Sequence, residues 1–80
     1  MDRDEILDRV IHVVCGVLNI DREMVTPESN FVFDLGAEST QSVELVAAFE
    51  EEFDIEMDPD EALQVQTVGE AADFIAKHLD

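Results

Sequence analysis

The sequence predicts an all-α fold, a small four-helix bundle of three long helices and one short helix, with a long loop between the first two. Apolar residues recur every three or four positions in three segments of the 80-residue chain, which is the pattern of amphipathic helices. Asp2 with Glu5, and Thr67 with Glu70, have the spacing of helix-start signals. Strands and helices do not alternate as a parallel sheet requires. We expect residues 1–80 to form a single domain.

The first helix is predicted to run from near Asp2 to residue 18. Its apolar stripe consists of Ile6, Val10, Val13, Val14 and Val17, with Leu7, Ile11 and Leu18 beside it. Many of these residues are β-branched, so residues 12–20 taken alone would also suit a strand. The long helical period favours a helix.

The segment 19–38 has no helical period and is predicted to be a loop. Asn, Pro and Gly interrupt it, and ordered loops of this length are usually functional. Phe31, Phe33 and Leu35 alternate within it, but a single strand would have no partner. We therefore expect these three side chains to hold the loop against the core.

Three further helices are predicted after this loop. The second runs from Ser39 to Phe53 and has one buried stripe. The third is short and runs from Pro59 to Val65, since proline fits the first turn of a helix. The fourth begins after Thr67. The core is expected to contain Val10, Val14, Leu45, Val46, Phe49, Ile75 and Leu79.

The charge of the chain restricts its partners. Four basic residues stand against 21 acidic ones, for a net charge of −17. Such a chain repels polyphosphates, which excludes nucleic acid as a partner, and it attracts basic protein surfaces. Every charged residue between Arg22 and Lys77 is acidic. We expect a monomer that binds basic-surfaced proteins.

The compartment is predicted to be the cytoplasm. Cys15 is the one cysteine, so no internal disulfide can form, and the charged N-terminal residues do not form a signal peptide. The uncharged run from Val10 to Ile20 is about half of the roughly 20 residues that a membrane-spanning helix needs. No transmembrane segment is expected. Cys15 is expected to pack as a small apolar side chain.

A motif stands at the junction of the long loop and the second helix: Asp34-Leu35-Gly36-Ala37-Glu38-Ser39. The run from Phe33 to Ile75 resembles the bacterial acyl carrier proteins. Their common pattern is Asp-Leu-Gly-Ala-Asp-Ser-Leu, then a Val-Glu-Leu helix, a Glu-Glu-Glu-Phe run and a Thr-Val-Gly turn. The resemblance extends over nearly the whole chain, in register.

This resemblance implies that Ser39 carries 4′-phosphopantetheine, attached by a phosphopantetheinyl transferase that uses coenzyme A. The chain would hold acyl thioesters on this arm and present them to acyl-transfer, synthase and modifying enzymes of fatty-acid or related lipid or polyketide biosynthesis. The residues agree, because a phosphodiester at a helix N-terminus faces free N–H groups and the positive end of the helix dipole. The alternative is that Ser39 is only a helix N-cap.

The resemblance also implies that the second helix docks partner enzymes. The acidic residues Glu38, Glu44, Glu50 and Glu51 would pair with Arg or Lys of those enzymes, and Val43 and Ala47 would supply apolar contacts. The chain departs from the family pattern at Thr40, where Leu is usual, and at Gln41, where an acidic residue is common. These departures alter the predicted docking site, so the pathway stays open between housekeeping fatty-acid synthesis and a specialised one. They also keep open the alternative of an acidic interaction module without cargo.

No metal or catalytic site is predicted. A calcium loop starting at Asp54 would need Gly and Glu where Pro59 and Val65 stand. His12 and His78 have no ligand spacing, and Ser39 lacks the glycines of a hydrolase elbow. We therefore expect a carrier and not an enzyme. In this family acyl chains can lie between the helices, and the five phenylalanines Phe31, Phe33, Phe49, Phe53 and Phe74 are expected to fill that space and leave room for short chains.

Overall fold

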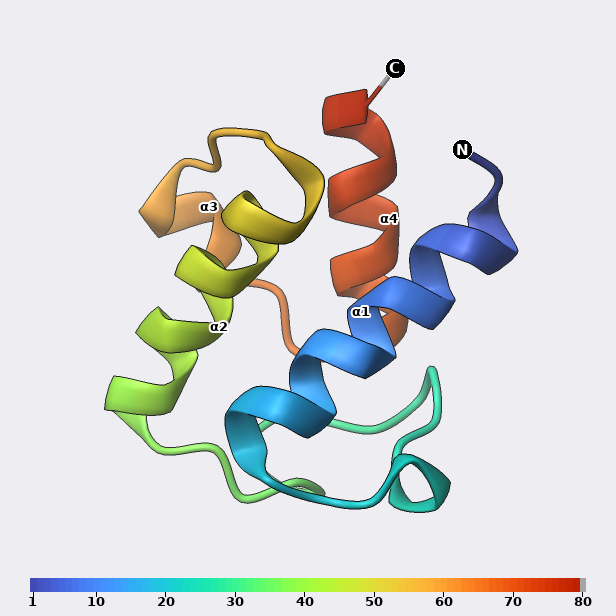
Figure 1. Cartoon of the computed structure of the whole chain (residues 1–80). Helices are drawn as coiled ribbons and strands as arrows, with labels where there is room; N and C mark the ends of the chain where they lie inside the picture. The colour runs from blue at the N-terminus through green and yellow to red at the C-terminus, as the bar shows by residue number, and fades with distance from the viewer. Residues whose placement is uncertain (80) are drawn as a thin grey trace.

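The structure is a computed structural model that describes residues 1–79; Asp80 lies outside the described residues. Within that range the α-helices are α1 (Arg3–Leu18), α2 (Ser39–Phe53), α3 (Pro59–Ala62) and α4 (Val68–Leu79), and a 3-10 turn, η1, lies at Arg22–Met24. The predicted all-α architecture of three long helices and one short helix is confirmed. In Figure 1 α1 runs obliquely from the N-terminus at the upper right toward the lower left, and it packs against both α2 and α4.

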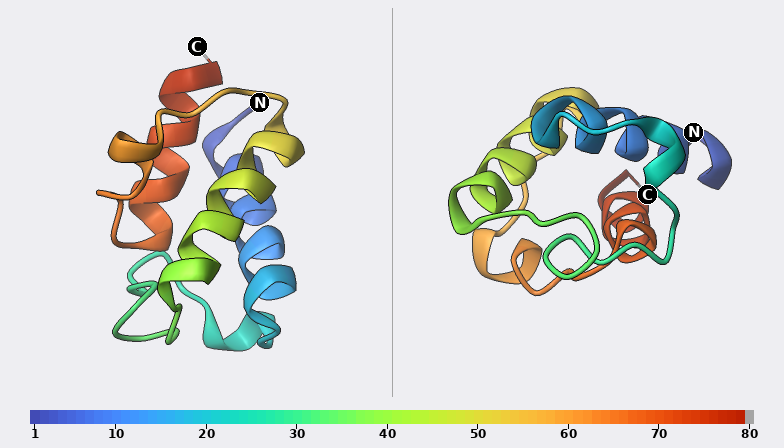
Figure 2. Two further views of the ribbon diagram at one scale, coloured as in Figure 1. Left: turned by 90° about the vertical axis from the view of Figure 1, so that its left-hand side faces the viewer. Right: turned by 90° about the horizontal axis from the view of Figure 1, so that it is seen from below.

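Helix α1 forms over a segment that also suits a strand. Capping interactions at both ends of the helix help to stabilise it. The Asp2 carboxylate accepts a hydrogen bond from the Glu5 N–H at 2.8 Å, as the Asp2–Glu5 spacing predicts. Asn19 ends the helix in the left-handed conformation, with φ 56°, which asparagine tolerates better than most residues. Seen from below in Figure 2, α1, α2, α3, α4 and the connecting loops surround a common interior, which the buried faces of the helices fill.

Helix α2 begins at Ser39 and ends at Phe53, as predicted, whereas α3 is shorter than predicted. It ends at Ala62 rather than near Val65, because the N–H groups of Gln64 and Val65 bond to carbonyls three residues earlier. Such bonds tighten the chain into turns that do not continue an α-helix.

The long loop is fastened to the start of α4. The N–H groups of Val68 and Gly69 bond to the carbonyl oxygens of Ser29 and Pro27, at 3.1 and 2.8 Å. These N–H groups belong to the first turn of α4, where a helix has no acceptors of its own. The Phe31 N–H bonds to the Gln66 carbonyl at 2.9 Å. The capping interaction predicted at Thr67 is also present, since its hydroxyl accepts a hydrogen bond from the Glu70 N–H at 3.2 Å.

The prediction that three alternating loop residues hold the loop to the core is wrong for one of them. Phe31 is buried and Leu35 packs against the core, but Phe33 is 88% exposed. The segment is a turn and not an extended chain, because the Asn30 side chain accepts hydrogen bonds from the N–H groups of Val32 and Phe33. Alternation therefore does not determine which side chains point inward.

The core agrees with the prediction at five of its seven residues. Val10, Val14, Leu45, Phe49 and Ile75 are buried. Val46 is half-buried, and Leu79 is 37% exposed because it is the last residue of α4. Within residues 1–79 no helix is long and apolar enough to cross a membrane.

Candidate functional site

Ser39 is the first residue of α2, at the end of the long loop, and it is exposed. It is not the helix N-cap: Glu38 holds that position. The alternative that Ser39 serves only as a cap is therefore wrong. Within residues 1–79 no group forms a hydrogen bond with the Ser39 hydroxyl, which is left free to react.

The Gln41 side chain caps the start of α2. The sequence did not indicate this interaction. The Gln41 Oε1 atom accepts a hydrogen bond from the Glu38 N–H at 2.9 Å. The N–H groups of Ser39 and Thr40 have no partner within the described residues. A phosphate ester on Ser39 would face these free donors and the positive end of the helix dipole, so the residues present fit a phosphopantetheine arm.

The predicted docking residues lie along one side of α2. Thr40, Glu44, Ala47 and Glu51 are spaced by three or four residues and are all exposed. Val43 is 60% exposed, and Glu38 is exposed at the start of the helix. None of these carboxylates takes part in an ion pair within residues 1–79. The side of α2 that faces solvent is therefore acidic, with two exposed apolar side chains among the carboxylates.

Glu50 differs from the other predicted docking carboxylates. It is half-buried, and its Oε2 atom accepts a hydrogen bond from the Met57 N–H at 2.9 Å. This contact fixes the chain after α2, so one oxygen of the Glu50 carboxylate is already occupied within the molecule.

The arginines lie elsewhere and are all paired. Arg3 pairs with Asp73, Arg22 with Asp8, and Arg9 with Glu52. The first two pairs join residues of α1 to α4 and to η1, and the third joins α1 to the last turn of α2. The arginines therefore form no ion pair with the exposed carboxylates of α2, Glu44 and Glu51.

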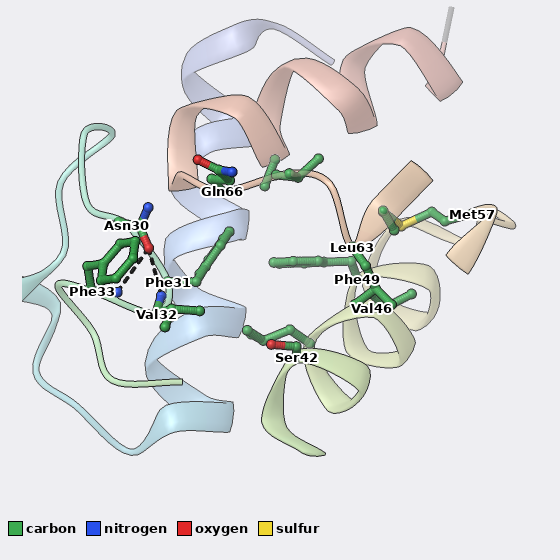
Figure 3. Close-up of a pocket in the computed structure, with 14 residues that line it drawn as sticks. Asn30, Phe31, Val32, Phe33, Ser42, Val46, Phe49, Met57, Leu63 and Gln66 are labelled. Atoms are coloured by element: carbon green, nitrogen blue, oxygen red, sulfur yellow. Dashed lines mark hydrogen bonds between the residues drawn. The ribbon is translucent and has the colours of Figure 1, made fainter. Parts of the chain in front are cut away.

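A cleft opens between α2 and the loop segment 30–33, with a volume of about 270 Å³ (Figure 3). The rings of Phe31 and Phe49 extend into it from opposite walls. Not one of the fourteen lining residues is charged: they are Asn30, Phe31, Val32, Phe33, Ser42, Leu45, Val46, Phe49, Met57, Ala62, Leu63, Val65, Gln66 and Ala71. In a chain with 31% charged residues, such a lining suits an apolar ligand.

The phenylalanines do not fill this cleft as expected. Phe31, Phe33 and Phe49 line it, whereas Phe53 and Phe74 do not. The Phe53 ring packs under Arg9, whose guanidinium lies 4.8 Å from the ring centroid. Phe74 contacts His78, with 4.6 Å between the ring centroids. Two of the five rings are therefore used at other places in the bundle.

The remaining reactive side chains lie apart from this site. Cys15 is half-buried on α1 and packs against the core. His12 and His78 are both exposed. No group of three or more metal-binding side chains is found within residues 1–79.

Comparison with known proteins gives the family. Residues 8–75 match the family model described as the phosphopantetheine attachment site. The acyl carrier protein of Caulobacter vibrioides is 52% identical over 73 residues, which cover 91% of this chain and 94% of that protein. The acyl carrier protein of Picosynechococcus sp. is 49% identical over 73 residues, covering 91% and 90%.

A eukaryotic relative also matches. Acyl carrier protein 2, mitochondrial, of Arabidopsis thaliana is 46% identical over 78 residues, which cover 98% of this chain and 62% of that protein. These matches extend over most of the chain, from α1 to α4, and imply a covalently attached 4′-phosphopantetheine. The chain belongs to the acyl carrier protein family.

Proposed function

We propose that this protein holds acyl intermediates as thioesters on a phosphopantetheine arm attached to Ser39. The observation that carries the proposal is the position of Ser39, exposed at the first residue of α2 with its hydroxyl and the adjacent N–H groups free. The arm would supply the terminal thiol to which acyl groups are esterified. Cys15 is a poor substitute, because it is half-buried among core residues of α1.

Attachment requires a transferase and coenzyme A. The Ser39 Oγ atom would form a new bond to the phosphorus that bears pantetheine, and the diphosphate bond of coenzyme A would break. Adenosine bisphosphate leaves, and the hydroxyl proton passes to a base of the transferase. The free N–H groups at the start of α2 would stabilise the negative phosphodiester that results.

The test is to incubate the purified protein with coenzyme A and a phosphopantetheinyl transferase and to measure its mass. We expect one phosphopantetheine per chain in the wild type and none in Ser39→Ala. Ser42→Ala is the matched control, because Ser42 lies one helical turn further along α2 and should not affect loading. Absence of a mass gain with several transferases, or loading of Ser39→Ala, would refute the proposal.

The cleft is proposed to shelter the acyl chain. Its uncharged lining and its position between α2 and the loop that precedes Ser39 support this role. A modified protein that is never acylated, and that binds a partner equally well after Ser39→Ala, would instead favour the interaction module without cargo.

The exposed stripe of α2 is proposed as the docking site for basic-surfaced enzymes of fatty-acid or related lipid or polyketide synthesis. Glu38, Glu44 and Glu51 would contribute unpaired carboxylates. The double variant Glu44→Gln/Glu51→Gln should raise the KM of such an enzyme for this protein at low salt. The difference in KM should fade at high salt, because exposed charges are screened. A double variant with the same charge on other helices, Glu5→Gln/Glu70→Gln, is the control and should change KM little.

A further inference from the structure

Phe33 is the most exposed of the large apolar side chains described in the structure, at 88%. Exposed apolar residues occur singly on most proteins and need no explanation. Phe33 is different because two other exposed apolar side chains, Val32 at 55% and Leu63 at 51%, line the same cleft. We call Val32, Phe33 and Leu63 the apolar rim. Val32 and Phe33 belong to the long loop, Leu63 follows α3, and none of the three is charged.

The exposure of Phe33 is fixed by hydrogen bonds. The Asn30 Oδ1 atom accepts bonds from the N–H groups of Val32 and Phe33, both at 2.9 Å. Asp34 Oδ2 accepts a bond from the Asn30 N–H at 2.7 Å, and the Gly36 N–H bonds to the Val32 carbonyl at 3.1 Å. These bonds hold the backbone of the turn, and in this conformation the Phe33 ring is exposed without a partner present.

The apolar rim lies within reach of an enzyme that works on Ser39. Phe33 and Ser39 are six residues apart, so even a fully extended chain would separate their Cα atoms by only about 20 Å. The bond from the Ala37 N–H to the Phe31 carbonyl, at 2.8 Å, folds this segment back and shortens that distance. A standard interface covers about 800 Å² on each partner, which is roughly 30 Å across. One docked enzyme can therefore cover both residues.

We propose that the apolar rim is a docking contact for the enzyme that modifies Ser39, and that Phe33 inserts into an apolar pocket surrounded by basic residues on that enzyme. This inference rests on the proposed function of Ser39. Charge argues against a second copy of the chain, which would bring another net charge of −17 against the first, whereas a basic enzyme surface is attracted. The nearness of Phe33 to Ser39 favours, among such enzymes, the one that modifies Ser39. Aromatic side chains, phenylalanine among them, are also enriched at protein–protein interfaces.

The experiment measures kcat/KM for loading of Ser39 by a phosphopantetheinyl transferase with unacylated coenzyme A. No acyl chain is present in this reaction, so cargo cannot mediate the effect. We expect Phe33→Ser to lower kcat/KM about tenfold through KM, as loss of an interface hot spot does. Phe33→Leu should keep most of the activity, within about threefold, because it keeps an apolar side chain.

Phe33→Glu separates an apolar contact from general charge attraction. If only negative charge recruits the transferase, an added carboxylate raises kcat/KM and the proposal fails. If Phe33 enters an apolar pocket, Phe33→Glu lowers kcat/KM at least as much as Phe33→Ser does, because removing the carboxylate from water costs more than the basic residues around the pocket return. Leu79→Ser is the control, since Leu79 lies at the end of α4 that is far from the start of α2 (Figure 1).

The outcomes distinguish this inference from the proposed function. If the wild type is not loaded, both fail. If the wild type is loaded, and Phe33→Ser and Phe33→Glu are loaded as fast as the wild type, only the docking role of the apolar rim is refuted. An equal loss in Leu79→Ser would also refute it. Urea unfolding of each variant accompanies the kinetics, and because Phe33 is exposed we expect the midpoint of its variants to stay near that of the wild type.

Discussion

Arg9 binds Glu52 at two points: its Nε atom donates to the Glu52 carboxylate at 2.8 Å, and its Nη2 atom donates to the Glu52 carbonyl oxygen at 2.6 Å. The same guanidinium lies over the Phe53 ring. One side chain of α1 thus satisfies a carbonyl in the last turn of α2, where a helix has no donors of its own.

Arg9→Ala is expected to lower the free energy of unfolding by about 1–2 kcal/mol, because it removes charge-assisted hydrogen bonds that are only partly exposed. Arg3→Ala is the matched control: it removes the same charge but breaks an exposed pair with Asp73, and should lower the free energy by less than about 1 kcal/mol. Urea unfolding measures both. Equal losses would show that Arg9 acts through its charge alone.

Two glycines are expected to respond oppositely to alanine. An added Cβ atom at Gly16 meets nothing within 4 Å, and alanine in a helix interior is favoured by about 0.5–1 kcal/mol. At Gly69 the added Cβ would lie 3.0 Å from the Pro27 carbonyl oxygen, which already accepts the Gly69 N–H bond. Gly16→Ala should raise the melting temperature and Gly69→Ala should lower it. A rise in both would mean that the loop can move away from α4 at little cost.

Gln41 is expected to stabilise the start of α2. Gln41→Ala removes the acceptor for the Glu38 N–H and should lower the free energy of unfolding by about 0.5–1 kcal/mol. Gln41→Glu should keep the bond, because the carboxylate offers the same acceptor atom. A loss as large in Gln41→Glu as in Gln41→Ala would contradict this reason. Thermal melting of the wild type and of both variants, followed by circular dichroism, measures these differences in stability.

The cleft predicts a limit to the acyl chain that can stabilise the protein. A cavity of about 150 Å³ holds a benzene ring, so at the same ratio 270 Å³ holds roughly ten carbons. Each buried methylene stabilises by about 0.8 kcal/mol. The melting temperature of acyl-loaded protein should therefore rise with chain length and level off near ten carbons.

Phe49→Leu should move this limit to longer chains, because Phe49 forms one wall of the cleft. Phe53→Leu is the control: it makes the same change at a buried ring that does not line the cleft, and should lower stability without moving the limit. A melting temperature that is independent of chain length would contradict the sheltering role.

The helices could be predicted from sequence because their signals are local. The stripe on α2 and the Thr67 cap depend on residues within one or two turns of each other. Contacts between segments that are distant in the sequence, or that are irregular, leave no such local pattern in the sequence. Phe33 points outward because Asn30 bonds its backbone, and alternation alone does not indicate that turn. Glu50 is occupied because the chain returns past it at Met57.

The site shows the same division. The position of Ser39 at the start of a helix follows from the helical period, and the family resemblance supplies its role. The cleft could not be sized from sequence, since its walls come from the loop, α2 and the segment around α3. The use of Phe53 elsewhere depends on Arg9 of α1, which lies far from it in the sequence.

The hydrogen bonds that join the loop to Gln66, Val68 and Gly69 have a mechanical consequence. They make one wall of the cleft move together with the first turn of α4, while the opposite wall belongs to α2, which rests on α1. We therefore expect a longer acyl chain to widen the cleft by moving α2 away from the loop, with the hydrogen bonds between the loop and α4 kept. The turn that holds Phe33 outward would keep its shape during this movement, so the same face would be presented by the empty and by the loaded carrier.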